Sequence, residues 1–123
     1  MTEVIEHKNK SFTVKVTEKD DNIDIDFIGR SSDRDPSEFL NPILTDLIYD
    51  EEKNNKFIVM NFKNLEYMNS STITPITKIL EKAKESKIQL KVRYNSKKKW
   101  QDLCFAALKI FETKDQRISI SGE

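Results

Sequence analysis

The sequence predicts a single α/β domain in which a mixed β-sheet carries helices packed on it. Three observations favour this class. The 123 residues suit one domain. Two alternating segments near the start predict a β-hairpin, and apolar strands then alternate with helical patterns, as in βαβ units. We place the domain at residues 11–121 and expect the polar residues 1–10 to form a flexible tail.

The predicted hairpin comes first in the domain. Residues 11–18 and 22–29 both alternate apolar with polar side chains, and only a short polar run separates them. The apolar side chains of each segment fall on one face: Phe12, Val14 and Val16 in the first, and Ile23, Ile25 and Phe27 in the second. Two such segments with a short connection are typical of antiparallel strands.

The pattern changes to a helical period at residue 36. Asp35 and Pro36 suit the N-cap and the first helical position. Pro42 lies inside the apolar stripe and predicts a kink or a new helix start at Asn41, because proline has no N–H to donate. The polar run at residues 50–55 predicts the end of this helix.

The second half of the chain alternates strands with helices. The apolar run at residues 57–62 is typical of a strand covered on both faces. A loop, LEYMNSST, precedes a second helix, and residues 88–94 predict another strand. The last helix, at residues 99–111, carries the apolar stripe Trp100, Leu103, Cys104, Ala107, Leu108 and Phe111. Residues 118–121 predict a final short strand.

Composition and charge exclude several classes of function. Lys plus Arg equals Asp plus Glu at 21 each, which argues against a general nucleic-acid binder, because such proteins need a basic excess. The only cysteine, Cys104, suits a reducing compartment. No stretch approaches the roughly 20 apolar residues that span a bilayer. We expect a cytoplasmic monomer or weak dimer with no membrane and no nucleic-acid partner.

Few residues suggest catalysis. The only histidine, His7, falls in the predicted tail, and one histidine with one cysteine is too few for a typical zinc site or a nucleophilic triad. Asp24 and Asp26 share a strand face and could bind a hard cation, although a solvated face explains them better. Lys97–Lys99 is a solvated helix start or a docking patch for an acidic partner or a phosphate. We expect no enzyme, cofactor or metal.

The loop before the second helix is the most informative segment. Ser70, Ser71 and Thr72 follow Asn69, and all four side chains are able to cap a helix. Proline costs no hydrogen bond only in the first three helical positions, so Pro75 favours a cap at Thr72. Ser70 and Ser71 would then lie in an exposed loop that a modifying enzyme can reach. The alternative is that these serines only cap the helix.

The residues FIVMNFKNLEYMNSSTI resemble the signature of STAS domains of the anti-sigma-factor-antagonist type. In that signature an apolar strand leads to a phrase like (Met/Ile)-Asp-Ser-Ser-Gly-Leu at a helix start. FLNPILTDL is similar to a helix of SiaC-type regulatory phosphoproteins, and KKKWQDLCFAALKIF resembles the Trp-Gln-containing helix of single-domain STAS-like regulators. These similarities cover residues 39 to 111 and imply a STAS-like mixed sheet.

The resemblance also implies a partner switch. A hydroxyl in this loop would be phosphorylated by a GHKL-type kinase and dephosphorylated by a PP2C-type phosphatase, and its state would select a partner such as a diguanylate cyclase or another effector. Ser71 matches the family's phosphoserine, and Ser70 is the second candidate. SiaC-type members carry a threonine nearby, which leaves the acceptor hydroxyl open. The implied partner-binding surface comprises Tyr67, Met68, Asn69, Ser70, Ser71 and Thr72. Asn69 replaces the Asp of the STAS phrase, and Thr72 replaces its Gly.

Two other functions compete with this prediction. A non-catalytic structural or assembly subunit would carry the same fold with no phosphorylation switch. A small hydrolase using surface carboxylates is a third possibility, although no pair of acidic residues stands out in the sequence.

Overall fold

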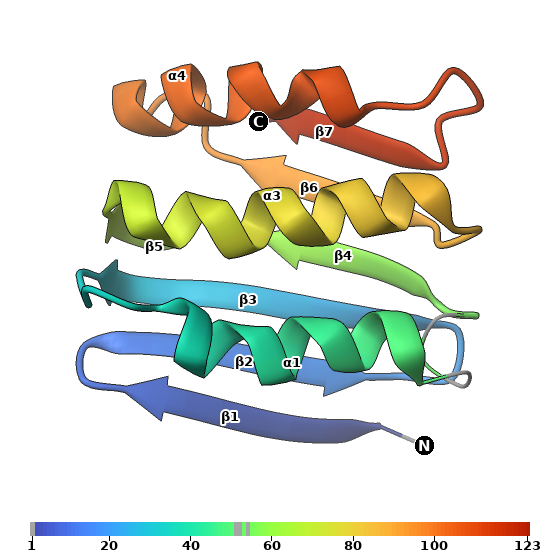
Figure 1. The fold of residues 1–123 in the computed structure, drawn as a ribbon, viewed down its shortest axis with the longest axis horizontal. Coiled ribbons are helices and arrows are strands. Elements are labelled where there is room, and N and C mark those ends of the chain that lie inside the picture. Colours follow the sequence, from blue (N-terminus) through green and yellow to red (C-terminus); the bar gives the residue numbers. More distant parts are fainter. Residues whose placement is uncertain (1, 51–52, 54) are drawn as a thin grey trace.

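The computed structural model describes residues 2–50, 53 and 55–123, which form two layers: a mixed sheet and helices that all lie over one of its faces (Figure 1). In chain order the elements are β1 (Glu3–Asn9), β2 (Phe12–Glu18), β3 (Asn22–Ser31), α1 (Ser37–Tyr49), β4 (Phe57–Asn61), β5 (Leu65–Met68), α3 (Ser70–Glu85), β6 (Leu90–Tyr94), α4 (Lys99–Ala107), the 3₁₀ helix η1 (Leu108–Phe111) and β7 (Ile118–Gly122).

The sheet has seven strands in the order β1-β2-β3-β4-β6-β7, with β5 beside the end of β3. The first three strands are antiparallel, and β3, β4, β6 and β7 are parallel. The predicted mixed α/β class and the predicted β2–β3 hairpin are confirmed. Because the parallel strands end at one edge, α3 and α4 both begin there (Figure 1).

The N-terminal segment is an edge strand and not a tail. β1 pairs with β2 over its whole length, from Glu3 opposite Glu18 to Asn9 opposite Phe12. Lys10 adopts a left-handed conformation with φ of 58°, which closes the tight turn between the two strands. The prediction of a flexible tail at residues 1–10 is therefore wrong for residues 3–9. The sequence of β1 lacks the apolar–polar alternation of a strand, because most of its side chains are exposed on both faces of the sheet.

An aromatic column runs across the core between the sheet and the helices. Neighbouring ring centroids lie between 4.2 and 6.4 Å apart along the series Phe39, Phe12, Phe27, Phe62, Phe105 and Tyr94. Phe62 occupies the middle and stacks on Phe27 at 4.2 Å. Such pairs stabilise a core beyond the area that they bury. The column links α1 at one side of the domain to α4 at the other.

Both internal prolines lie within continuous helices. Pro42 is inside α1 and Pro75 inside α3, so the predicted new start at Asn41 is wrong. Each proline leaves the carbonyl four residues earlier without its helical hydrogen bond. Those carbonyls belong to Glu38 and Ser71, whose residues are exposed, so water can hydrogen-bond to them.

The start of α1 also differs from the prediction. Pro36 holds the N-cap position, and the helix begins at Ser37, so Asp35 does not cap it. The apolar stripe of this helix is confirmed, since Leu40, Ile43, Leu44 and Leu47 are buried. The helix ends at Tyr49, as the following polar run predicts. Residues 51, 52 and 54 of that run lie outside the described residues.

The last helix turns a different face to the core than its sequence suggests. Gln101, Phe105 and Leu108 are buried, whereas Leu103, predicted to be in the core, is 70% exposed. Gln101 takes the inner position because its amide hydrogen-bonds buried backbone groups, which a leucine cannot do. The helix tightens into η1 at Leu108.

The face of the sheet away from the helices is polar. Asp24 forms an ion pair with Lys19 at 3.0 Å, and Asp26 accepts a hydrogen bond from Asn61 at 3.1 Å. Among residues 2–50, 53 and 55–123, no group of three or more His, Cys, Asp or Glu side chains could hold a metal ion. No helix in the same part of the chain is long and apolar enough to cross a membrane.

Candidate functional site

The segment before α3 is a short strand and not the predicted loop. β5 pairs with the end of β3, where a bulge shifts the register between Gly29 and Arg30. Gly29 has φ of 91°, and a Cβ there would lie 2.1 Å from the carbonyl oxygen of Ser11, so only glycine fits the bulge. The pairing with β3 extends to Met68, and the backbone N of Asn69 then donates to the carbonyl of Ser31, so the chain is fixed up to the start of α3.

α3 begins at Ser70 with Asn69 as its N-cap, three residues earlier than the cap at Thr72 predicts. The Oδ1 atom of Asn69 accepts hydrogen bonds from the Thr72 backbone N at 3.1 Å and from Thr72 Oγ1 at 2.7 Å. Asparagine is among the best N-cap residues. The predicted cap is wrong because α3 tolerates Pro75 beyond its third position. Pro75 has no N–H to donate to the carbonyl of Ser71, but Ser71 is exposed, so water can hydrogen-bond to that carbonyl.

Asn69 also joins three segments of the chain. Its Nδ2 donates to the carbonyl oxygen of Asp33 at 2.6 Å, and its backbone N donates to the carbonyl of Ser31 at 3.0 Å. Beneath it, the hydroxyls of Ser31 and Thr72 lie 2.7 Å apart and are both buried. We call Asn69, Ser31, Thr72 and Asp33 the cap network. It fixes the start of α3 to the connection between β3 and α1.

The two serines above the cap network are open to solvent. Ser70 and Ser71 are exposed and occupy the first two positions of α3. None of the hydrogen bonds formed within the described part of the chain involves either hydroxyl. The first N–H groups and the positive end of the helix dipole lie at the same place, which favours a negative group there. The predicted exposure is therefore observed, although in a helical turn and not in a loop.

The predicted partner-binding surface is only partly accessible. Thr72 is 1% exposed and Met68 is buried, so their side chains lie in the core and cannot touch a partner. Tyr67 is exposed, and the guanidinium of Arg30 lies 4.8 Å from its ring centroid. Sequence reasoning missed Arg30, because only the pairing of β3 with β5 brings it beside Tyr67. The accessible surface comprises Arg30, Tyr67, Asn69, Ser70 and Ser71.

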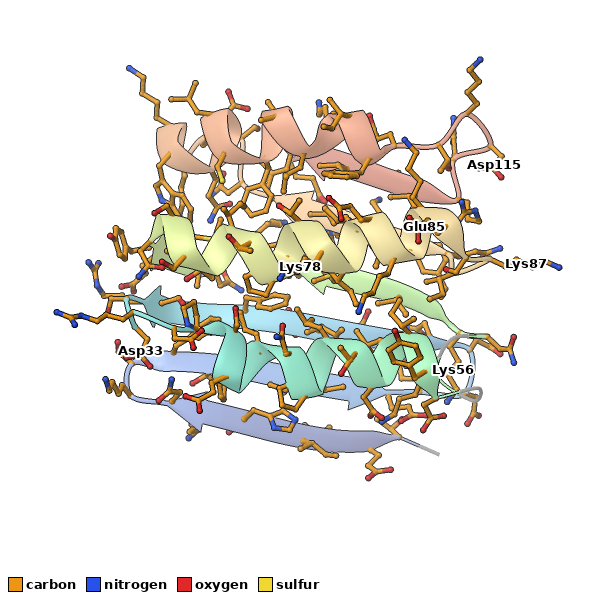
Figure 2. All side chains as sticks on the ribbon, in the orientation of Figure 1. Asp33, Lys56, Lys78, Glu85, Lys87 and Asp115 are labelled. Atoms are coloured by element: carbon orange, nitrogen blue, oxygen red, sulfur yellow. The ribbon has the colours of Figure 1, made fainter. Side chains whose placement is uncertain are left out.

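Charged groups fix the neighbouring connection between β3 and α1. Asp33, which Figure 2 shows at the edge where α3 begins, accepts hydrogen bonds from Lys10 Nζ at 2.7 Å and Asn9 Nδ2 at 2.8 Å. Lys10 and then Asn9 lower the pKa of the Asp33 carboxyl, so it stays ionised at neutral pH. Asp33 thus binds the β1–β2 turn through its carboxylate and Asn69 through its carbonyl.

The three lysines at residues 97–99 differ in their contacts. Lys98 Nζ donates to the carbonyl oxygens of Lys63 at 3.2 Å and Leu65 at 3.3 Å, whereas Lys97 and Lys99 are exposed. Only these two lysines can contribute to a docking patch. Lys98 instead stabilises the connection that leads into β5.

Gln101 stabilises the same connection from inside the core. Its Nε2 donates to the carbonyls of Phe62 at 2.7 Å and Leu65 at 2.9 Å, and its Oε1 accepts from Asn95 N at 2.7 Å. Gln101 is fully buried. The sequence offered only a faint signal for it, the Trp-Gln pair of the last helix.

A family model described as "SiaC family regulatory phosphoprotein" matches residues 5–107. The chain belongs to the SiaC family of regulatory phosphoproteins. The SiaC resemblance of the sequence is thereby confirmed, and the match includes residues 5–9 of β1, which the sequence assigned to a tail. No curated protein matches this SiaC family chain.

One solved structure similar to the SiaC family chain is an uncharacterized protein of the DUF3478 family with a SpoIIAA-like fold, from Shewanella loihica PV-4. It shares 11% sequence identity with a TM-score of 0.49, over 99% of this chain and 86% of that one.

The cap network gives a prediction for Asn69→Asp. Aspartate caps a helix as well as asparagine does, so capping alone predicts unchanged or higher stability. Because Asp lacks the Nδ2 donor and faces the Asp33 carbonyl at 2.6 Å, we expect a loss of about 1–2 kcal/mol. Urea denaturation of both proteins measures it. Equal stability would show that the bond to Asp33 contributes nothing.

Proposed function

We propose that this SiaC family chain is a phosphorylation-controlled protein-binding regulator whose acceptor is a serine at the start of α3. The observation that carries the proposal is the exposure of two hydroxyls, those of Ser70 and Ser71, at a helix N-terminus whose cap is fixed by the cap network. In a family of regulatory phosphoproteins, such a pair of hydroxyls is the natural place for the phosphate.

Accessibility limits which hydroxyl can be the acceptor. Thr72 is buried and bonded to both Asn69 and Ser31, so a kinase cannot reach it in the folded protein. Ser71 is the first candidate, because it matches the phosphoserine position of the STAS phrase. Ser70 is the second candidate, since it is equally exposed and lies one position earlier in the helix.

A phosphate at either serine is compatible with the fold. It adds about −1.5 to −2 charges at neutral pH. Negative charge at a helix N-terminus is favourable by about 0.3–1 kcal/mol. Modification therefore changes the surface that a partner meets and not the stability of the domain, as a reversible switch requires.

The proposed partners follow from the same mechanism. A GHKL-type kinase adds the phosphate and a PP2C-type phosphatase removes it, while a diguanylate cyclase or another effector binds one of the two states. All would act in the cytoplasm. They would contact Tyr67, Asn69 and the two serines, with Arg30 beside them. In this role the chain binds proteins and catalyses no reaction.

Mass spectrometry of protein isolated from its own cells tests the proposal. We expect phosphate on the peptide that contains Ser70 and Ser71, and its loss in either Ser71→Ala or Ser70→Ala, whichever removes the acceptor. Thr74→Ala is the matched control, because Thr74 is an exposed hydroxyl on the same helix. Finding no phosphate on this peptide under any growth condition would favour the structural or assembly subunit.

A further inference from the structure

The outer side of α4 and η1 carries an uncovered apolar surface. Leu103 and Ile110 are 70% and 74% exposed, the highest values among the large hydrophobic side chains that the structure describes. Ala106 and Ala107 between them are also exposed. These four side chains form one apolar strip along α4 and η1, and continuous exposed apolar surface indicates a contact with another protein.

The surface has two distinct flanks. α4 lies at one edge of the helix layer, with α1 at the opposite edge (Figure 1), and it buries Gln101 and Phe105. With 3.6 residues per turn in α4 and three in η1, the outward positions divide into an apolar and a charged row. The apolar flank comprises Leu103, Ala107 and Ile110, and the charged flank comprises Asp102, Ala106 and Lys109.

We propose that this surface binds a second copy of the chain, with the two α4 helices antiparallel about a two-fold axis. In such an interface residue i meets residue j of the second copy, and j meets i. Asp102 lies near the start of α4, and Lys109 lies seven residues later on the same flank. Antiparallel packing therefore sets each Asp102 against Lys109 of the other copy and forms two ion pairs.

The apolar flank has the same symmetry. Antiparallel packing sets Leu103 against Ile110 of the second copy at both ends of the contact. The alanines lie in the middle, where small side chains let two helices approach closely. The contact is small, so the dimer is weak and reversible. The proposed dimer interface contains none of the residues of the proposed phosphorylation site. The dimer can therefore be tested independently of the proposed function.

Sedimentation equilibrium over a wide range of protein concentrations tests the dimer. We expect reversible dimerisation of the native chain and a monomer for Leu103→Ser, with an unchanged melting temperature because Leu103 is exposed. Tyr49→Ser is the matched control, since Tyr49 is 69% exposed on α1, and it should dimerise normally. A native chain that stays monomeric at all concentrations would overturn the proposal.

Charge reversal tests the geometry separately. Asp102→Lys or Lys109→Asp alone sets like charges against each other twice, and each should weaken the dimer about tenfold. An equal mixture of the two variants should recover native affinity, because every lysine at these positions then faces an aspartate in the mixed dimer. If the mixture associates no better than the single variants, the antiparallel arrangement is wrong.

Discussion

Replacing Gln101 with leucine is expected to lower the free energy of unfolding by about 3–5 kcal/mol, although leucine is apolar and the site is fully buried. The amide of Gln101 donates hydrogen bonds to the carbonyls of Phe62 and Leu65 and accepts one from the N–H of Asn95. Leucine would leave the Asn95 N–H without its acceptor and would remove one donor from each carbonyl, although the Phe62 carbonyl keeps the Leu65 N–H and the Leu65 carbonyl keeps Lys98 Nζ. An unsatisfied polar group costs about 1–3 kcal/mol, and each lost hydrogen bond costs about 0.5–1.5 kcal/mol.

Chemical denaturation of the two proteins measures this loss. Lys99→Leu serves as the control, because it introduces the same residue at an exposed position of α4, where the change should stay within about 0.5 kcal/mol. A Gln101→Leu protein within about 1 kcal/mol of the native one would mean that water or a local shift replaces the three hydrogen bonds.

The second large effect concerns binding. If the proposed function is right, Ser71→Asp should weaken the interaction with the effector that binds the unmodified protein several-hundred-fold. A carboxylate at the start of α3 must be desolvated in the interface, and a cost of about 3–4 kcal/mol corresponds to that loss of affinity. The same charge favours the helix itself, so the melting temperature should stay within a few degrees.

Calorimetric titration with an effector recovered by pull-down checks this prediction, together with a thermal scan. Ser70→Asp tests the second candidate in the same way. Thr74→Asp adds the same charge one turn further along α3 and should change the affinity much less. Unchanged affinity of both serine variants would exclude the start of α3 as the switch.

The elements with a one-sided apolar pattern could be predicted from the sequence. β2, β3 and β6 alternate apolar with polar side chains, and α1 and α3 each carry an apolar stripe, as burial on one side dictates. The apolar run of β4 predicted cover on both faces, but Ile58 and Met60 are buried in that strand whereas Phe57 is 39% exposed. β1 could not be predicted, because an edge strand exposed on both faces has no such pattern. β5 has only four residues, and it pairs with the end of β3 beyond the bulge at Gly29, a contact that the sequence pattern does not reveal.

For the site, the sequence identified the serines but not what surrounds them. Ser70 and Ser71 are exposed, as predicted from their place before an apolar helix. The burial of Thr72 depends on Ser31, 41 residues earlier, and the position of Asn69 depends on Asp33. Contacts over such separations arise from the tertiary fold and cannot be predicted from local spacing. The position of Pro75 alone therefore predicted a cap at Thr72, whereas Asn69 caps the helix.

The two outermost strands of the sheet also bear on aggregation. β1 leaves one row of backbone groups unpaired within the sheet, but it carries the charged side chains Glu3, Glu6 and Lys8 along its length. β7 at the opposite side has only five residues. Charges and short length are the features by which edge strands avoid acting as templates for other chains. Neither side of the sheet therefore favours growth into fibrils.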